Sequence, residues 1–156
     1  MNAIFVFMEH VIYKTIVGIP DKEVLTDVTF LYASLFESAQ LEFFKERIFS
    51  KEDLLTLVAY QHTTPVGFKI GYRYNETTFY SWIGGVLKAY RKNKIGQKLM
   101  SLQHQIIKEK GYTRVRTKSM NTYKPMMILN LLQGFDIIKV YTNEVNQTKI
   151  VFEKDL

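Results

Sequence analysis

The feature that most constrains the fold is an apolar segment whose periodicity changes at a basic turn. Phe79–Leu87 is mostly apolar and is typical of a β-strand. After the turn formed by residues 91–94, apolar residues recur at spacings of four, three and four, which predicts a helix over Ile95–Lys110 that ends before Gly111. A strand that leads straight into a helix leaves backbone N–H groups free at the positive end of the helix dipole. The sequence therefore predicts a phosphate or pyrophosphate site at this junction.

The remaining pattern predicts six further strands and three further helices. The strands are expected at Val11–Gly18, Leu54–Tyr60, Val66–Tyr74, Thr113–Lys118, Phe135–Tyr141 and Lys149–Glu153. The helices are expected after an N-cap at Asp21, at Leu41–Phe49 and at Lys124–Leu132. The unit Phe79–Lys118 predicts a right-handed parallel crossover. The order indicates an α+β fold with a mixed, mostly antiparallel central sheet of about seven strands and about four helices.

Composition excludes several kinds of chemistry. The 156 residues are 47% hydrophobic and 23% charged, which is ordinary for one globular domain spanning residues 1–156. There is no cysteine, so disulfides, thiolate metal sites and a cysteine nucleophile are excluded. The three histidines show no metal-ligand spacing, so we expect no metal site.

The distribution of charge narrows the range of partners. The formal net charge is +6, and the basic residues concentrate in Lys88–Lys98 and Lys108–Lys124. This clustering favours a local anion site over a long nucleic-acid track, whose binding would fall steeply with salt. The apolar segment Met1–Met8 is far shorter than the ~20 residues of a membrane span. We therefore expect a cytoplasmic protein with no membrane association and no nucleic-acid partner.

The basic turn also carries a family resemblance. Tyr90–Gly96 is similar to the pyrophosphate loop of the GNAT superfamily of acetyl-coenzyme A-dependent N-acyltransferases, which usually reads Gln/Arg-x-x-Gly-x-Gly/Ala. Arg91 and Gly96 occupy the first and last of these slots, and Lys94 stands where the first glycine is usual. The resemblance implies coenzyme contacts from one continuous run of residues. These residues are Arg91, Lys92, Asn93, Lys94, Ile95, Gly96 and Gln97.

The preceding strand is expected to hold the pantetheine arm of acetyl-coenzyme A. Gly84 and Gly85 are costly inside a strand and indicate a bulge or the close approach of another backbone. In the GNAT superfamily the pantetheine arm lies along this strand like an added strand. The resemblance therefore implies that Val86 and Lys88 offer it backbone groups. An N–H group near Val86 or Leu87 is expected to stabilise the thioester oxyanion.

The late helix is similar to the family pattern Asn-x-x-Ala/Met-x-x-Ile/Leu-Tyr/Asn-x-x-x-Gly-Phe. The residues on matching slots are Met126, Leu129, Asn130, Gly134 and Phe135. Either Asn121 or Tyr123 is expected to contact the pantetheine. Many relatives carry at the slot of Asn130 a tyrosine that protonates the departing thiolate. An amide can hydrogen-bond the sulfur or the acceptor but supplies no proton, which leaves Tyr123, water or the amine's own proton for this step.

The resemblance implies direct attack of an amine on the thioester of acetyl-coenzyme A, without a covalent enzyme intermediate. The acceptor is a small-molecule or protein amine, and no single residue stands out as the general base. The candidates are Glu42, Glu46, His62, Tyr72 and Tyr80. The alternative is a non-catalytic module that binds acyl-coenzyme A, which the amide of Asn130 and the missing base favour. The closing hairpin also leaves pairing across a homodimer open.

Overall fold

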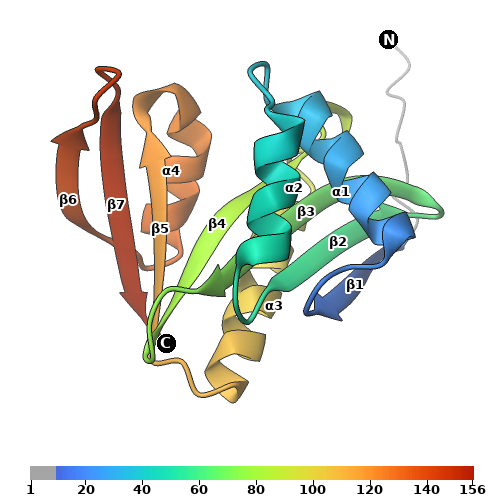
Figure 1. Ribbon diagram of the computed structural model, residues 1–156, viewed down its shortest axis with the longest axis horizontal. Coiled ribbons are helices and arrows are strands. Elements are labelled where there is room, and N and C mark those ends of the chain that lie inside the picture. The colour runs from blue at the N-terminus through green and yellow to red at the C-terminus, as the bar shows by residue number, and fades with distance from the viewer. Residues whose placement is uncertain (1–9) are drawn as a thin grey trace, which may run out of the picture.

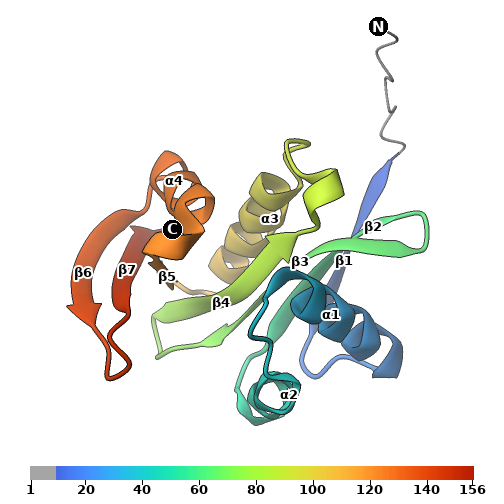
Figure 2. The ribbon, with the colours of Figure 1, turned by 90° about the horizontal axis from the view of Figure 1, so that it is seen from above.

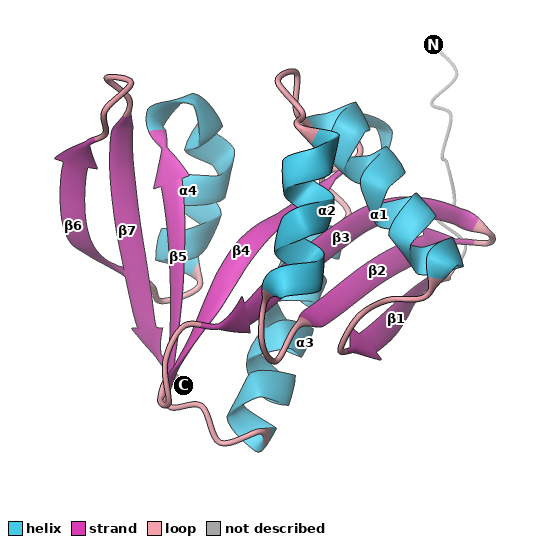
Figure 3. Cartoon of the chain, in the orientation of Figure 1, coloured by secondary structure: helices cyan, strands magenta, loops and turns pink. Residues whose placement is uncertain are grey.

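The computed structural model describes residues 10–156, so the apolar segment Met1–Met8 lies outside the described residues. It confirms an α+β fold with seven strands and four α-helices within that range (Figures 1 and 3). The strands are β1 (Val11–Val17), β2 (Leu55–Gln61), β3 (Thr64–Arg73), β4 (Thr78–Val86), β5 (Arg114–Met120), β6 (Asp136–Thr142) and β7 (Thr148–Asp155). The helices are α1 (Lys22–Leu35), α2 (Leu41–Ser50), α3 (Ile95–Glu109) and α4 (Lys124–Leu132). Two short 3-10 turns, η1 (Lys88–Tyr90) and η2 (Asn121–Tyr123), follow β4 and β5.

One sheet organises the whole described chain, in the order β1-β2-β3-β4-β5-β7-β6. All neighbouring pairs are antiparallel except β4 and β5, which are parallel and joined through α3. This confirms that the unit is a parallel crossover. Within residues 10–156, none of the helices combines the length and the apolarity that a membrane span requires.

Helices cover the sheet on both faces, as Figure 2 shows from above. On one face, Val28 of α1 and Phe44 of α2 pack against Phe68 of β3. On the other face, α3 and α4 pack over a second cluster that includes Met100 and Phe79. Asp21 caps α1 as predicted, because its Oδ1 accepts a hydrogen bond from Val24 N at 2.9 Å. The apolar stripes of the helices therefore determine which face each helix buries.

The join between β4 and β5 is short. Parallel pairing runs only from Thr78 opposite Arg114 to Tyr80 opposite Arg116. One further link follows, in which Thr117 Oγ1 donates to Ser81 O at 2.8 Å. Beyond it β4 and β5 diverge, and no described strand pairs with the last residues of β4 on that edge (Figures 1 and 2). The sheet thus opens into two halves, β1–β4 and β5-β7-β6.

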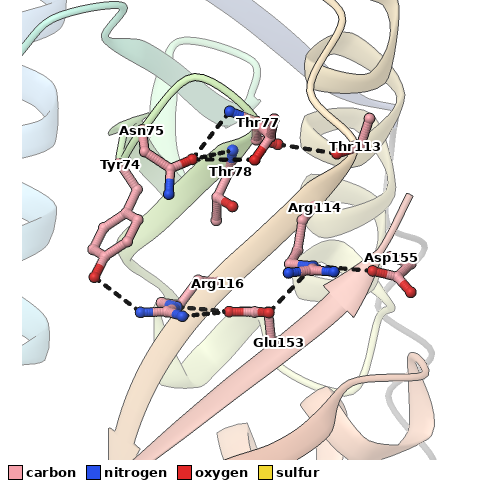
Figure 4. A network of polar contacts seen from close by, with 9 residues as sticks. All are labelled: Tyr74, Asn75, Thr77, Thr78, Thr113, Arg114, Arg116, Glu153 and Asp155. Atoms are coloured by element: carbon pink, nitrogen blue, oxygen red, sulfur yellow. Dashed lines mark hydrogen bonds and ion pairs between the residues drawn. The ribbon is translucent and has the colours of Figure 1, made fainter.

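A network of polar contacts reinforces the closed end of this opening (Figure 4). Arg116 lies at its centre, donating to Glu153 Oε2 at 2.8 Å and to the Tyr74 hydroxyl at 2.9 Å. Arg114 donates to Asp155 Oδ1 at 3.1 Å and pairs with Glu153 at 3.2 Å. Because these contacts join the β3–β4 turn, β5 and β7, they hold the two halves together where the backbone pairing is shortest.

For the glycine pair Gly84 and Gly85 in β4, the sequence left open a bulge or the close approach of another backbone, and the structure shows where each occurs. The β3–β4 register shifts between Ile70 and Gly71, which leaves Trp82 as the extra residue on β4. The bulge therefore lies two residues before Gly84. A Cβ atom at Gly84 would lie 2.7 Å from the carbonyl oxygen of Phe68, so this glycine is required by the close approach of β3.

Candidate active site

The turn before α3 presents a row of free backbone donors. The first helical hydrogen bond runs from Lys98 N to Lys94 O at 2.9 Å. No atom of residues 10–156 accepts a hydrogen bond from the N–H groups of residues 92–97. Lys94 is the N-cap residue, and its side chain makes no capping hydrogen bond. The donors at which the sequence places a pyrophosphate are therefore not used by the protein itself.

Side chains of the turn shape it and leave it basic. Arg91 Nε donates to Val86 O at 3.0 Å, which ties the turn to the end of β4. Asn93 Nδ2 donates to the carbonyl oxygens of Tyr90 and Arg91, each at 3.1 Å. The lysines Lys88, Lys92 and Lys94 are exposed beside them. Cationic groups and the helix dipole therefore act on the same small volume.

Two lysines of the turn adopt a backbone conformation that favours glycine. The φ angles are +65° at Lys92 and +59° at Lys94. This left-handed region costs a residue with a Cβ atom about 1 kcal/mol or more. Lys94 occupies the slot where the GNAT pattern has glycine. The side chain differs from that pattern, but the backbone of Lys94 has a φ angle that glycine adopts readily.

Lys94→Gly is expected to raise the free energy of unfolding by about 1 kcal/mol, because glycine adopts this φ without strain. Urea denaturation followed by circular dichroism measures the change. Lys98→Gly, at an exposed position inside α3, is the matched control and is expected to lower the free energy of unfolding by about 1 kcal/mol. If both variants have a lower free energy of unfolding than wild type, the inference that the backbone of Lys94 is strained is contradicted.

The free edge of β4 presents backbone groups to the opening. Leu87 N donates to Val66 O at 2.9 Å, so this N–H faces β3, and of the two N–H groups expected near the thioester only that of Val86 stays a candidate. Hydrogen-bonding direction alternates along an antiparallel strand, which turns the N–H of Val86 and the N–H and C=O of Gly84 away from β3 and toward the opening. The C=O of Val86 already accepts from Arg91 Nε. The carbonyl of Lys88 accepts from Arg91 N at 3.3 Å within η1 and is likewise used by the turn. Sequence reasoning gave Gly84 no role at this edge.

The two catalytic candidates lie at different depths. Asn130 of α4 is 2% exposed, and its Nδ2 has no partner among the described residues. Tyr123 in η2 is 42% exposed, and its ring packs edge-on against Phe36 at 6.0 Å. Asn121 is exposed beside Tyr123. The structure therefore places Asn130 inside the fold and Tyr123 at the open end of β5.

The five candidate bases divide into exposed side chains and side chains that are buried or partly buried. Glu42, Glu46 and His62 are exposed. Burial raises the pKa of Tyr72, although Arg47 donates to its hydroxyl at 3.4 Å. Burial, followed by the neighbouring Tyr72, raises the pKa of Tyr80 to about 12. Both tyrosines therefore keep their protons near neutral pH.

A buried polar group on the α3 face was not indicated by the sequence. Lys69 of β3 alternates with apolar residues and would be assigned to solvent, yet it is only 9% exposed. Burial lowers its pKa to about 8. The available signal was Gly67, Gly71 and Gly84, because small residues on one face allow a helix to pack closely over it.

Two surface depressions lie away from the junction of β4 and α3. One lies beside residues 141–145, and a second is lined by Asp53, Arg73 and Lys110. Neither touches the free amides or the open edge of β4. No cluster of three or more His, Asp or Glu side chains within residues 10–156 could hold a metal ion.

An open sheet edge beside a basic helix start is a geometry suited to an extended anionic ligand. The profile of the acetyltransferase (GNAT) family matches residues 23–126. The chain therefore belongs to the GNAT family of acetyltransferases, which confirms the resemblance found in the sequence.

Solved structures share this fold at low sequence identity. NAA60 of Arabidopsis thaliana in complex with acetyl-CoA superposes with a TM-score of 0.76 at 15% identity, covering 94% of this chain and 99% of that chain. The IAA acetyltransferase of Bacillus cereus gives a TM-score of 0.76 at 16% identity, covering 94% and 100%. A GNAT family acetyltransferase of Elizabethkingia anophelis with acetyl-CoA bound gives 0.73 at 15% identity, covering 92% and 98%. No curated protein matches the chain significantly.

Proposed function

We propose that this protein transfers the acetyl group of acetyl-coenzyme A to an amine by direct attack on the thioester. The observation that carries the proposal is the row of unused N–H groups at residues 92–97, next to the unpaired edge of β4. Membership of the GNAT family supports acetyl transfer. The similar folds that bind acetyl-CoA support it as the co-substrate.

The coenzyme would be held mainly by backbone groups. Its pyrophosphate accepts from the amides of residues 92–97, and Arg91, Lys92 and Lys94 add positive charge. Its pantetheine arm pairs with Val86 and Gly84 as an added strand in the opening. This arrangement directs the thioester toward the region where β4 and β5 begin to diverge. The enzyme would then act chiefly by positioning and by polarising the thioester carbonyl.

The acceptor amine would approach from the face covered by α1 and α2. That face of β3 and β4 carries Tyr72, Tyr80 and Trp82, and the Arg47 guanidinium lies 5.2 Å from the Trp82 ring. The partly buried Trp82 is also the bulged residue of β4, so it marks the point where the strand bends. The acceptor that we propose is a small-molecule amine or a protein amine.

Calorimetric titration with acetyl-coenzyme A tests the coenzyme site. We expect one site per chain with a micromolar dissociation constant, about 8 kcal/mol of binding free energy. A panel of amines, followed by assay of free thiol, then tests transfer. Binding without thiol release across the panel would favour the non-catalytic module, and absence of binding would remove both functions.

A further inference from the structure

A group of buried polar side chains lies beneath the β-sheet, on the side of α3 and α4. Lys69, Ser81 and Gln103 are 9%, 2% and 0% exposed. Ser81 Oγ, both polar atoms of the Gln103 side chain and Asn130 Nδ2 find no hydrogen-bond partner within residues 10–156. The Lys69 side chain forms no ion pair or hydrogen bond with any described residue. Because buried polar atoms are normally paired, this group is suited to a polar ligand.

The side chain of Lys69 extends toward the opening of the sheet. Lys69 lies opposite Gly84 in the β3–β4 register, and its Cγ lies 3.4 Å from where a Cβ at Gly84 would stand. The glycine therefore leaves room for the lysine to pass beneath β4. The charge of Lys69 acts on His104 of α3, whose ring centroid is 5.5 Å from that of Phe135, the residue before β6. Lys69 thus reaches from β3 to the side chains that border the other half of the sheet.

The surroundings of Lys69 are positive or neutral. Burial first, and then the positive charges of Lys69 and Lys154, lower the pKa of His104 to about 3, so this imidazole stays neutral. The titratable groups that share this region are Lys69 of β3 and Lys154 of β7, whose charges both act on His104 of α3. Ser81 of β4 and Asn130 of α4 do not titrate. No described carboxylate pairs with this lysine, so a negative charge formed in the opening would be strongly stabilised.

We propose that Lys69 donates the proton that the departing coenzyme thiolate requires, the step for which Asn130 has no proton to give. This inference rests on the proposed function, because the thiolate arises only if acetyl-coenzyme A occupies the opening. Lys69 is then a catalytic residue in contact with the leaving sulfur, and Asn130 Nδ2 is a second donor to that sulfur.

The atoms of the step balance. The amine nitrogen forms a bond to the thioester carbonyl carbon while the C–S bond breaks and its electron pair goes to sulfur. The Lys69 ammonium transfers one proton to sulfur and becomes a neutral amine. The acceptor nitrogen releases one proton to water, and water returns one to Lys69. A pKa of about 8 for Lys69 lies near the thiol value of about 8.5, so the transfer is nearly balanced in energy.

The test compares Lys69→Met and Lys69→Arg with the wild-type protein and uses coenzyme A alone. The far-ultraviolet absorbance of the thiolate, followed against pH, gives the thiol pKa of bound coenzyme A without any acceptor. In the wild-type protein we expect this pKa about one unit below that of free coenzyme A. In Lys69→Met the shift is expected to vanish, and in Lys69→Arg it is expected to remain.

Lys118→Met is the matched control, because Lys118 is an exposed lysine of β5 whose ammonium lies 5.8 Å from the Tyr141 ring. We expect it to behave as wild type. If circular dichroism shows that both proteins are folded and the thiol pKa is the same in wild type and in Lys69→Met, the role of Lys69 is overturned. The proposed function is not affected by that result. Failure of the wild-type protein to bind coenzyme A overturns the proposed function and this proposal with it.

Turnover provides a second readout once an acceptor is found. Lys69→Met is expected to lower kcat on the order of 100-fold while the KM for acetyl-coenzyme A changes about threefold or less. In the wild-type protein we expect kcat to fall above about pH 8, because the Lys69 ammonium loses its proton there. In Lys69→Met this fall is expected to disappear, because the variant has no ammonium group at that position. An unchanged kcat and an unchanged pH profile would contradict the proposal.

Discussion

Gly96→Val is expected to weaken the binding of acetyl-coenzyme A about 100-fold, or about 2.7 kcal/mol. Gly96 is the second residue of α3, and a Cβ there would lie 3.7 Å from Val86 Cγ2 and 3.9 Å from Leu129 Cδ2. The glycine therefore stands where α3, β4 and α4 converge. The two further methyl groups of valine would occupy the space through which the coenzyme reaches the amides of residues 92–97.

The loss is expected in binding and not in folding. Valine has a higher helix propensity than glycine, and the first atom of its side chain meets only ordinary contacts. The free energy of unfolding should change by less than about 1 kcal/mol in urea denaturation, while calorimetry shows the loss of affinity. Gly96→Ala is the control and should bind within about threefold of wild type. Equal losses of binding and stability in the valine variant would count against the loop assignment.

The sequence predicted the order of elements well because each depends on local periodicity. A strand at Phe79–Leu87, the basic turn and a helix at Ile95–Lys110 were all expected from one continuous segment, and the structure has β4 and α3 within one residue of these bounds. The N-cap at Asp21 was also predictable, since capping depends on residues three apart. Family resemblance then supplied the role of the turn. The fold and the family could therefore be predicted from the amino-acid sequence.

Features that depend on the pairing of distant segments were not predictable. The direction of the Leu87 N–H depends on its register with Val66, and the bulge at Trp82 depends on how β3 pairs with β4. A period-two pattern shows that Lys69 faces away from Phe68 but not that α3 covers that face. The buried lysine was therefore missed, although it lies on the strand next to the most informative segment.

The length of the β4–β5 join makes the site sensitive to changes in the neighbouring strand. Within residues 10–156 the strand pairing of β4 with β5 consists of three residue pairs, and Phe79 and Tyr80 belong to two of them. Phe79 is fully buried and packs its ring over Gly71 of β3. A change at Gly71 would therefore displace the part of β4 that fixes where the opening begins.

Gly71→Ala is expected to lower the free energy of unfolding by about 3 kcal/mol. A Cβ at this position would lie 2.3 Å from Phe79 Cε1 and 2.6 Å from the carbonyl oxygen of Tyr80, so β4 has to move. Urea denaturation measures the loss, with Gly96→Ala as the same chemical change at a site with room for it. Because the clash includes a backbone atom, a rotamer change of Phe79 cannot relieve it. A loss below about 1 kcal/mol would show that β3 and β4 separate easily, and the short join would then not fix the geometry of the coenzyme site.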